Sequence, residues 1–271
     1  MHTALLDAAR DARLAPSILN TKPWRWETVG SALELHADPA RRLPHLDPHG
    51  QLMTLSCGAA LHHARLALAA AGYEPVVERR PDADHPTLLA RIGLGEERPA
   101  GRECLETYRC LPLRRTDRRP FPPGARVPDA TLTRLRAAAE AEGAHLYVLA
   151  REDVAYLRYA AQGAHTLGAH DAEIAAELER WAGAARPAPL RDAGSGAEYL
   201  VVATDADGPD DWLKAGEATS AVWLTATACG LAASPLSEVV EVPGARKLIR
   251  SLLHPPREPQ LVLRVGVAAP H

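Results

Sequence analysis

The chain has 271 residues, of which 46% are hydrophobic and 24% are charged, and its formal net charge is −3. This length and composition predict a globular protein with a sizeable core. This charge gives no strong global field that favours nucleic acid or an anionic membrane, and no apolar stretch reaches the ~20 residues needed to span a bilayer. The N-terminus has the pattern of an amphipathic helix and not of a signal peptide. The four cysteines suggest neither a disulfide framework nor a zinc site, so we expect a cytoplasmic protein.

The N-terminal part of the chain predicts a helix, a hairpin, a buried helix and two further strands. The first helix ends at Ala15-Pro16, because the residue before a proline disfavours the helical conformation, and Gly30 marks the turn of the hairpin. A long, almost wholly apolar run predicts the buried helix, which Gly72 caps. In chain order the elements are the helix 3–14, the strands 24–28 and 32–37, the helix 52–71, and the strands 74–79 and 87–94.

The stretch Gly95–Gly101 is the predicted boundary between a first half, residues 1–97, and a second half, residues 98–271. Residues 183–197, rich in Ala, Gly and Pro, predict a linker. The other elements expected in the second half are the helices 103–112 and 129–142, the strand 145–149, one or two helices over 152–182 with a break near Gly163 or Gly168, the strand 198–204, the helix 210–229 capped by Gly230, the helix 243–253 and the strand 260–267.

The two long helices resemble each other when the run that starts at Gly58 is laid over the run that starts at Gly216. Matching positions along the two runs include Ala60 with Ala218, Leu66 with Leu224, Ala70 with Ala228, and Gly72 with Gly230. The closing strands also agree, because Arg91-Ile92-Gly93 resembles Arg264-Val265-Gly266. Convergence of two Ala-rich buried helices is the alternative, but two features in the same order favour duplication of one ancestral half.

Several well-known catalytic motifs are absent from the sequence. There is no G-x-G-x-x-G after a strand, no phosphate-binding G-x-x-x-x-G-K-[ST], no G-x-S-x-G and no H-E-x-x-H. The twelve histidines are scattered, and His62-His63 are adjacent on a helix, so they point to different faces. We therefore predict no metal site and no side-chain nucleophile.

Three segments could carry ligand chemistry instead. The first, PSILNTKPW (residues 16–24), sets Ser, Asn, Thr and Lys donors between two prolines, and Trp24 would anchor it in the core. The second, LRRTDRRPF (113–121), offers guanidinium forks that bind phosphate. The third, GLAASPLSE (230–238), has small residues that allow a flat ligand to approach the backbone. A capped turn, a solvated charged face and plain helix-to-strand packing are the structural alternatives.

These three segments, in this order, resemble those of the nitroreductase superfamily, and most closely its tandem, single-chain branch, the Acg family. PSILNTKPW is similar to the superfamily's P-S-x-x-N-x-Q-P-W loop, with Lys22 in place of Gln, and LRRTDRRPF is similar to its R-R-[ST]-x-R motif. The resemblance runs from about residue 4 to residue 267. It implies an α+β, nitroreductase-like fold, in which two related α/β halves are fused as a pseudo-dimer around central buried helices.

The resemblance also implies one FMN per chain, because only the second half has an R-R-T-D-R run. Arg114 and Thr116 would hold the phosphate and ribityl chain with help from Arg115, and Arg118 would lie near the flavin N1/C2=O edge. The family's Arg-rich tail is missing, so Arg246 or Lys247 would substitute for it. The remaining implied FMN-binding residues are Pro16, Ser17 and Asn20 from the first half, and Pro235, Leu236, Ser237 and Glu238, which line the ring, with a backbone N–H near N5.

The activity implied is an FMN-dependent oxidoreduction, in which two electrons pass from NAD(P)H through flavin N5 to a small organic acceptor with ping-pong kinetics. We expect a monomeric pseudo-dimer or a weak homodimer. The segment between Trp181 and Tyr199 is shorter than the lid-bearing region of many tandem members, so one flavin face is expected to be open. The alternatives are a protein that sequesters FMN, a pseudoenzyme without cofactor, and a biosynthetic flavin-dependent dehydrogenase.

Overall fold

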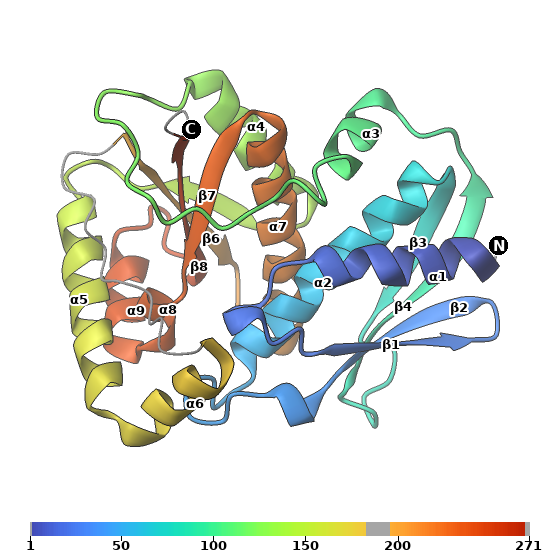
Figure 1. Ribbon diagram of the computed structural model, residues 1–271, viewed down its shortest axis with the longest axis horizontal. Coiled ribbons are helices and arrows are strands. Elements are labelled where there is room, and N and C mark those ends of the chain that lie inside the picture. Colours follow the sequence, from blue (N-terminus) through green and yellow to red (C-terminus); the bar gives the residue numbers. More distant parts are fainter. Residues whose placement is uncertain (1, 183–195, 269–271) are drawn as a thin grey trace. The chain divides into compact units, whose positions relative to one another are not determined.

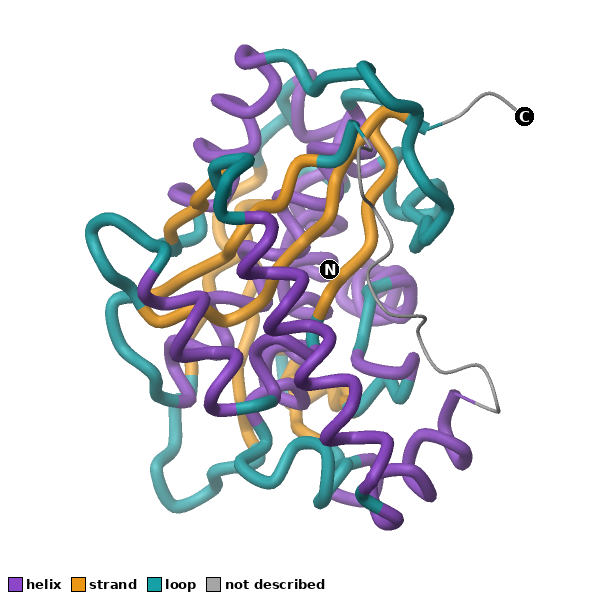
Figure 2. The backbone as a smooth tube through the Cα atoms, turned by 90° about the vertical axis from the view of Figure 1, so that its left-hand side faces the viewer, coloured by secondary structure: helices purple, strands orange, loops and turns teal. Residues whose placement is uncertain are grey.

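The computed structural model describes residues 2–182 and 196–268 and divides into two compact units (Figures 1 and 2). Unit 1 consists of Met1–Arg114 and Gly208–Leu224, and unit 2 consists of Arg115–Asp207 and Thr225–His271. Each unit contains one four-stranded, wholly antiparallel sheet. No helix among the described residues combines the length and the apolar character that crossing a membrane requires.

Unit 1 is built on a sheet with the strand order β1-β2-β4-β3. Helices α1 and α2 pack on one face of this sheet, and Leu33, Leu35, Leu61 and Ile92 lie in the core that they enclose (Figure 1). Gly30 has a φ of 58°, as the hairpin turn between β1 and β2 requires. The elements of unit 1 are α1 (His2–Asp11), β1 (Trp24–Val29), β2 (Ala32–Ala37), α2 (Gln51–Ala70), β3 (Tyr73–Arg79), β4 (Leu88–Glu97) and α3 (Arg102–Tyr108), with short 3-10 turns over Ala12–Leu14, Ile18–Asn20 and Pro39–Arg41.

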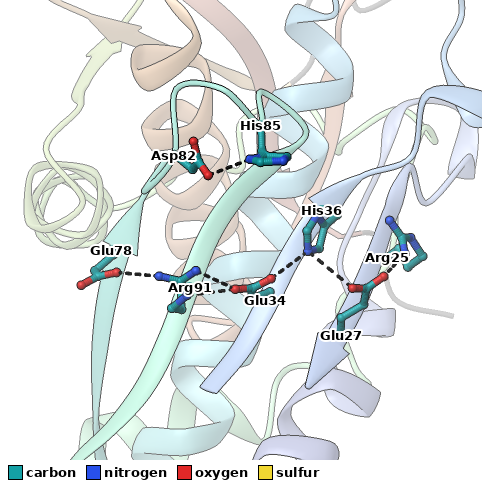
Figure 3. Close-up of polar contacts among 8 residues, drawn as sticks. All are labelled: Arg25, Glu27, Glu34, His36, Glu78, Asp82, His85 and Arg91. Atoms are coloured by element: carbon teal, nitrogen blue, oxygen red, sulfur yellow. Dashed lines mark hydrogen bonds and ion pairs between the residues drawn. The ribbon is translucent and has the colours of Figure 1, made fainter. Parts of the chain in front are cut away.

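The other face of the first sheet carries a row of charged side chains (Figure 3). The Arg91 guanidinium donates to the Glu34 carboxylate at 2.8 Å and to Glu78 at 3.5 Å, and His36 continues the row from Glu34 towards Glu27. Burial of Glu34 would raise its pKa, but hydrogen bonds from Arg91 and His36 outweigh that cost, so the pKa lies below its usual value. Strand alternation therefore produces one apolar face and one ionic face.

Unit 2 is built on a sheet with the strand order β5-β6-β8-β7, which repeats the order of the first sheet. Helices α8 and α9 pack against β8, α5 packs against both of them, and α4 packs against β5. The elements of unit 2 are α4 (Asp129–Ala141), β5 (His145–Val148), α5 (Val154–His170), α6 (Ala172–Ala182), β6 (Glu198–Thr204), β7 (Leu231–Leu236), α8 (Glu238–Glu241), α9 (Pro243–Ser251) and β8 (Glu258–Val267).

Helix α7 (Pro209–Ala228) follows β6 as α2 follows β2, yet its residues up to Leu224 belong to unit 1. The fully buried carboxylate of Glu217 accepts hydrogen bonds from Arg65 on α2 and Arg79 on β3, each at 2.7 Å. This buried ion pair ties α7 to the helix and the sheet of unit 1.

The crossing of α2 and α7 is reciprocal. A methyl group added to Gly58 would lie 2.1 Å from the carbonyl oxygen of Leu213, and one added to Gly216 would lie 2.0 Å from that of Leu55. Leu55 matches Leu213 at the spacing by which Gly58 matches Gly216 in the sequence repeat. Each helix therefore uses the same residues against the other, as in an interface with twofold symmetry.

The predicted α+β class, with two α/β halves and central buried helices, is confirmed. Three details of the prediction were wrong. Helix α3 ends at Tyr108 and not at 112; the helical region over 152–182 breaks at Asp171 and not at Gly163 or Gly168; and residues 231–236 form a strand. The boundary predicted at 97/98 separates the two sheets, while the compact units divide after Arg114. Most of the predicted linker and the last three residues lie outside the described residues.

Candidate functional site

The segment 115–121 of unit 2 runs along the edge of the second sheet (Figure 1). Thr116 forms a parallel bridge with Ala233 on the edge strand β7, and the backbone N–H of Asp117 donates to the Ala233 carbonyl oxygen at 2.9 Å. Two predicted ligand-binding segments that are distant in sequence, the arginine run and the peptide after α7, are therefore neighbours in unit 2.

A buried arginine holds this segment in place. Arg264 on β8, with 2% of its surface exposed, donates to the carbonyl oxygens of Asp117 at 3.3 Å and Arg119 at 2.8 Å. Its guanidinium also lies 3.9 Å from the ring centroid of Phe121. Gly266 leaves room for that ring, because a methyl group there would come within 2.3 Å of it. Charge-assisted bonds and a cation–π contact thus fix the backbone of the segment.

The side chains of the segment divide into a paired set and an exposed set. Asp117 and Arg119 pair with each other at 2.6 Å, and the hydrogen bond from Arg119 lowers the pKa of the Asp117 carboxyl. Arg115, Thr116 and Arg118 are exposed. Two guanidinium groups and one hydroxyl, presented from a fixed backbone, are a donor set suited to an anionic ligand.

The end of β7 carries the second group of predicted residues. Pro235 and Leu236 close the strand, Ser237 precedes the short helix α8, and Glu238 begins it. Burial raises the pKa of the Glu238 carboxyl, while the positive charge of Arg118 opposes that shift. The charge of Arg118 therefore acts on Glu238 within unit 2.

Arg114, the last residue of unit 1, has a donor that no described residue satisfies. Its guanidinium lies 4.6 Å from the ring centroid of Trp223 on α7, and its Nε is buried without a hydrogen-bond partner among residues 2–182 and 196–268. Desolvation lowers the pKa of Arg114, although an arginine stays charged at any relevant pH. A buried, unsatisfied cationic donor is costly, and a phosphate oxygen would satisfy it.

The loop 16–22 of unit 1 has a fixed and strained backbone. The N–H of Lys22 donates to Ser17 Oγ at 2.9 Å, and the N–H of Ile18 donates to Ser56 Oγ on α2 at 3.1 Å. Pro16 and Ser17 are half-buried, and Asn20 is exposed. Three residues of the loop adopt the left-handed region that side chains other than glycine rarely enter, namely Leu19, Asn20 and Lys22, with φ values of 45°, 57° and 47°.

Trp24 anchors this loop, as the sequence predicted. Its side chain is buried in the core of unit 1, at the start of β1. A strained backbone that surrounding structure holds in place is a common property of ligand-binding loops. The structure thus favours a preformed loop over an adaptable one.

Arg246 is engaged in packing within unit 2. Its guanidinium donates to the Asp207 carboxylate at 2.7 Å and to the Pro259 carbonyl oxygen at 3.0 Å, which links α9 to β8. A phosphate would compete with these bonds, so the role implied for Arg246 stays a prediction and receives no support from its contacts.

Arg264 and Phe121 are the structural residues that the analysis of the sequence missed. The signal was present, because Arg264 and Gly266 repeat Arg91 and Gly93, but the repeat was interpreted only as a trace of duplication. A buried arginine in a strand that is otherwise apolar indicates a specific partner.

Curated relatives match almost the whole chain. "Putative NAD(P)H nitroreductase Rv3131" of Mycobacterium tuberculosis is 35% identical, over 94% of this chain and 82% of the relative. "Putative NAD(P)H nitroreductase acg" of the same organism is 33% identical, over 94% of this chain and 86% of the relative. No protein-family model matches.

A solved nitroreductase with bound FMN from Bacteroides fragilis is 15% identical and has a TM-score of 0.43, over 60% of this chain and 89% of that chain, a likeness too low to carry an argument. The two mycobacterial relatives, in contrast, are matched over most of their length at more than 30% identity. The chain therefore belongs to their family, the Acg branch of the nitroreductases.

Proposed function

We propose that the chain is an FMN-dependent oxidoreductase of nitroreductase type, which passes two electrons from NAD(P)H to a small organic acceptor. The pairing of Thr116 with Ala233 carries the proposal, because it brings the arginine segment beside the peptide 235–238. The names of the mycobacterial relatives support the same reaction class.

The cofactor would supply the two-electron chemistry, and the chain supplies position and charge. Arg114, Arg115 and Thr116 would hold the phosphate and the ribityl chain, and the unsatisfied Nε of Arg114 supports this assignment. Arg118 would lie near the flavin, where its permanent charge would favour the reduced, more negative form. Donor and acceptor occupy the same place in turn, so the expected kinetics are ping-pong.

The peptide 235–238 lines the ring. Pro235 and Leu236 would offer an apolar surface to the ring, and Ser237 and Glu238 would offer backbone N–H groups. Burial raises the pKa of the Glu238 carboxyl. Pro16, Ser17 and Asn20 stay in the proposal on the family resemblance alone.

We also propose that the chain arose by duplication and binds one FMN. The repeated strand order and the reciprocal crossing of α2 and α7 support duplication. Only the second half carries an R-R-T-D-R run, which supports a single complete site. We propose the cytoplasm as its location, where the four free thiols are stable.

The first test is to load the purified chain with FMN and then add NADH or NADPH without oxygen. We expect one flavin per chain and prompt bleaching of the flavin band. A bound flavin that neither nucleotide reduces would contradict the proposed oxidoreductase activity. It would instead support a protein that sequesters FMN. A chain that cannot be loaded would overturn the whole proposal.

The second test removes the proposed anion-binding charges. Arg114→Ala combined with Arg118→Ala should weaken FMN binding by about 100-fold or more, because hydrogen bonds to charged groups contribute roughly 1.5–3 kcal/mol each. The control is Arg102→Ala, on the exposed face of α3, where the side chain is 92% exposed. Unchanged binding in the double variant would show that the site lies elsewhere.

A further inference from the structure

Arg264 contacts the backbone on both sides of one site residue. Its two terminal nitrogens donate to the carbonyl oxygens of Asp117 and Arg119, which flank Arg118. The Arg118 side chain itself is exposed. The buried cation therefore fixes the peptide from which Arg118 extends.

Two hydrogen bonds and a ring contact join the guanidinium of Arg264 to this peptide. Its neighbours across the strands are Tyr199 on β6 and Ser234 on β7, and neither is acidic. The ring of Phe121 covers the guanidinium on one side. A guanidinium that is 2% exposed depends on its hydrogen bonds, so the contacts to the two carbonyl oxygens are strongly directional.

We propose that Arg264 is a positioning residue that sets the preference of the site for reduced over oxidised flavin by holding Arg118 in place. The inference rests on the proposed function. Coulomb energy depends on distance, so a charge on a fixed backbone stabilises the reduced ring more than the same charge on a mobile one. Loss of Arg264 leaves the charge of Arg118 intact but removes its alignment.

The experiment compares Arg264→Gln with the native holoprotein in two measurements: the dissociation constant of oxidised FMN and the midpoint potential of the bound flavin. We expect the variant to lose about tenfold in its preference for reduced flavin, which for a two-electron couple corresponds to a fall of about 30 mV. Arg264→Lys, which keeps the charge but not the forked geometry, should fall between the two.

The matched control is Arg91→Gln, the arginine at the corresponding position of the first sheet. It removes a guanidinium that also makes two contacts, in this case the ion pairs to Glu34 and Glu78, and should leave the potential unchanged. A purely structural role for Arg264 predicts a lower melting temperature with an unchanged potential. If the glutamine variant does not fold, the lysine variant decides the question by the same measurement.

A double-mutant cycle tests whether Arg264 acts through Arg118. Arg118→Ala alone should lower the potential, and Arg264→Gln added to it should produce no further fall. Additive effects would overturn the proposed route, and an unchanged potential in both Arg264 variants would overturn the inference while leaving the proposed function standing. A native chain that binds no FMN would instead overturn the proposed function.

Discussion

Strands β4 and β8 occupy the same place in two sheets of the same order, and each carries an arginine two residues before a glycine. Arg91 lies opposite Glu34 and Glu78 and forms an ion-pair row on the sheet face away from the helices. Arg264 lies opposite Tyr199 and Ser234 and is buried under the segment 115–121. The comparison shows that one framework position joins an ion-pair row in one sheet and holds a covering peptide in the other.

Burial along the two strands reports this difference. Strand β4 alternates between buried and half-buried residues in its middle, while β8 is buried at every position from Pro259 to Gly266. On β4, the arginine forms ion pairs with acidic residues of the neighbouring strands. On β8, which is covered on both faces, the arginine donates hydrogen bonds to the covering peptide. The second sheet thus differs from the first mainly because the segment 115–121 covers it.

The largest effect is expected where the two helices cross, and it tests the likeness of the halves. Gly58→Ala and Gly216→Ala should each cost about 3 kcal/mol or more, because the new methyl group meets a backbone carbonyl that cannot move aside. The free energy of unfolding in urea measures this cost. Gly163→Ala in α5, where nothing lies within 4 Å, should be neutral or stabilising. Unequal costs at Gly58 and Gly216 would break the reciprocity.

An effect of intermediate size is expected when the same substitution is made at matching positions of the two sheets. Gly266→Ala should cost roughly 1–3 kcal/mol, because the methyl group displaces the buried ring of Phe121 from Arg264. Gly93→Ala, at the matching position of β4, should cost far less, since the nearest atom is 4.0 Å from the added carbon. Urea denaturation of both variants measures the loss of unfolding free energy. Equal losses would contradict the role assigned to the segment 115–121, which includes Phe121.

The smallest effects are expected for two glutamates whose contributions to stability change with pH in opposite directions. The pKa of Glu34 is lowered, so its stabilisation is present above its unfolded pKa and is lost as pH falls through the folded value. The pKa of Glu238 is raised, so its stabilisation is present below the unfolded pKa and is lost as pH rises through the folded value. At pH 7, Glu34→Gln should therefore destabilise and Glu238→Gln should stabilise, each by about 1 kcal/mol at most. Urea midpoints between pH 4 and 7 check both signs; two shifts of the same sign would contradict the assignment.

Much of the fold could be predicted because helices and turns leave local signals in the sequence. These signals are the spacing of apolar residues and the positions of glycines at helix ends and turns. The buried helices α2 and α7 have uniform apolar runs closed by Gly72 and Gly230, and the hairpin is marked by Gly30. Strand β7 was missed because LAASPL has no β-branched or aromatic residue, so only its pairing with β8 makes it a strand.

The candidate site could be predicted only at the level of segments. The arginine run and the peptide after α7 were identified by residue type, but their adjacency depends on the bridge between Thr116 and Ala233, which no local pattern encodes. The positive φ values of Leu19, Asn20 and Lys22 also arise from tertiary contacts, since none of the three is a glycine. The pairing of Arg246 with Asp207 likewise needed the fold.

The bridge between Thr116 and Ala233 has a consequence for how the chain resists self-association. Strand β7 ends its sheet, and an open strand edge is a template on which another molecule can add a strand. The peptide that carries the proposed cofactor arginines occupies part of that edge. The same peptide therefore serves two purposes, because it presents the proposed cofactor arginines and blocks part of the open edge.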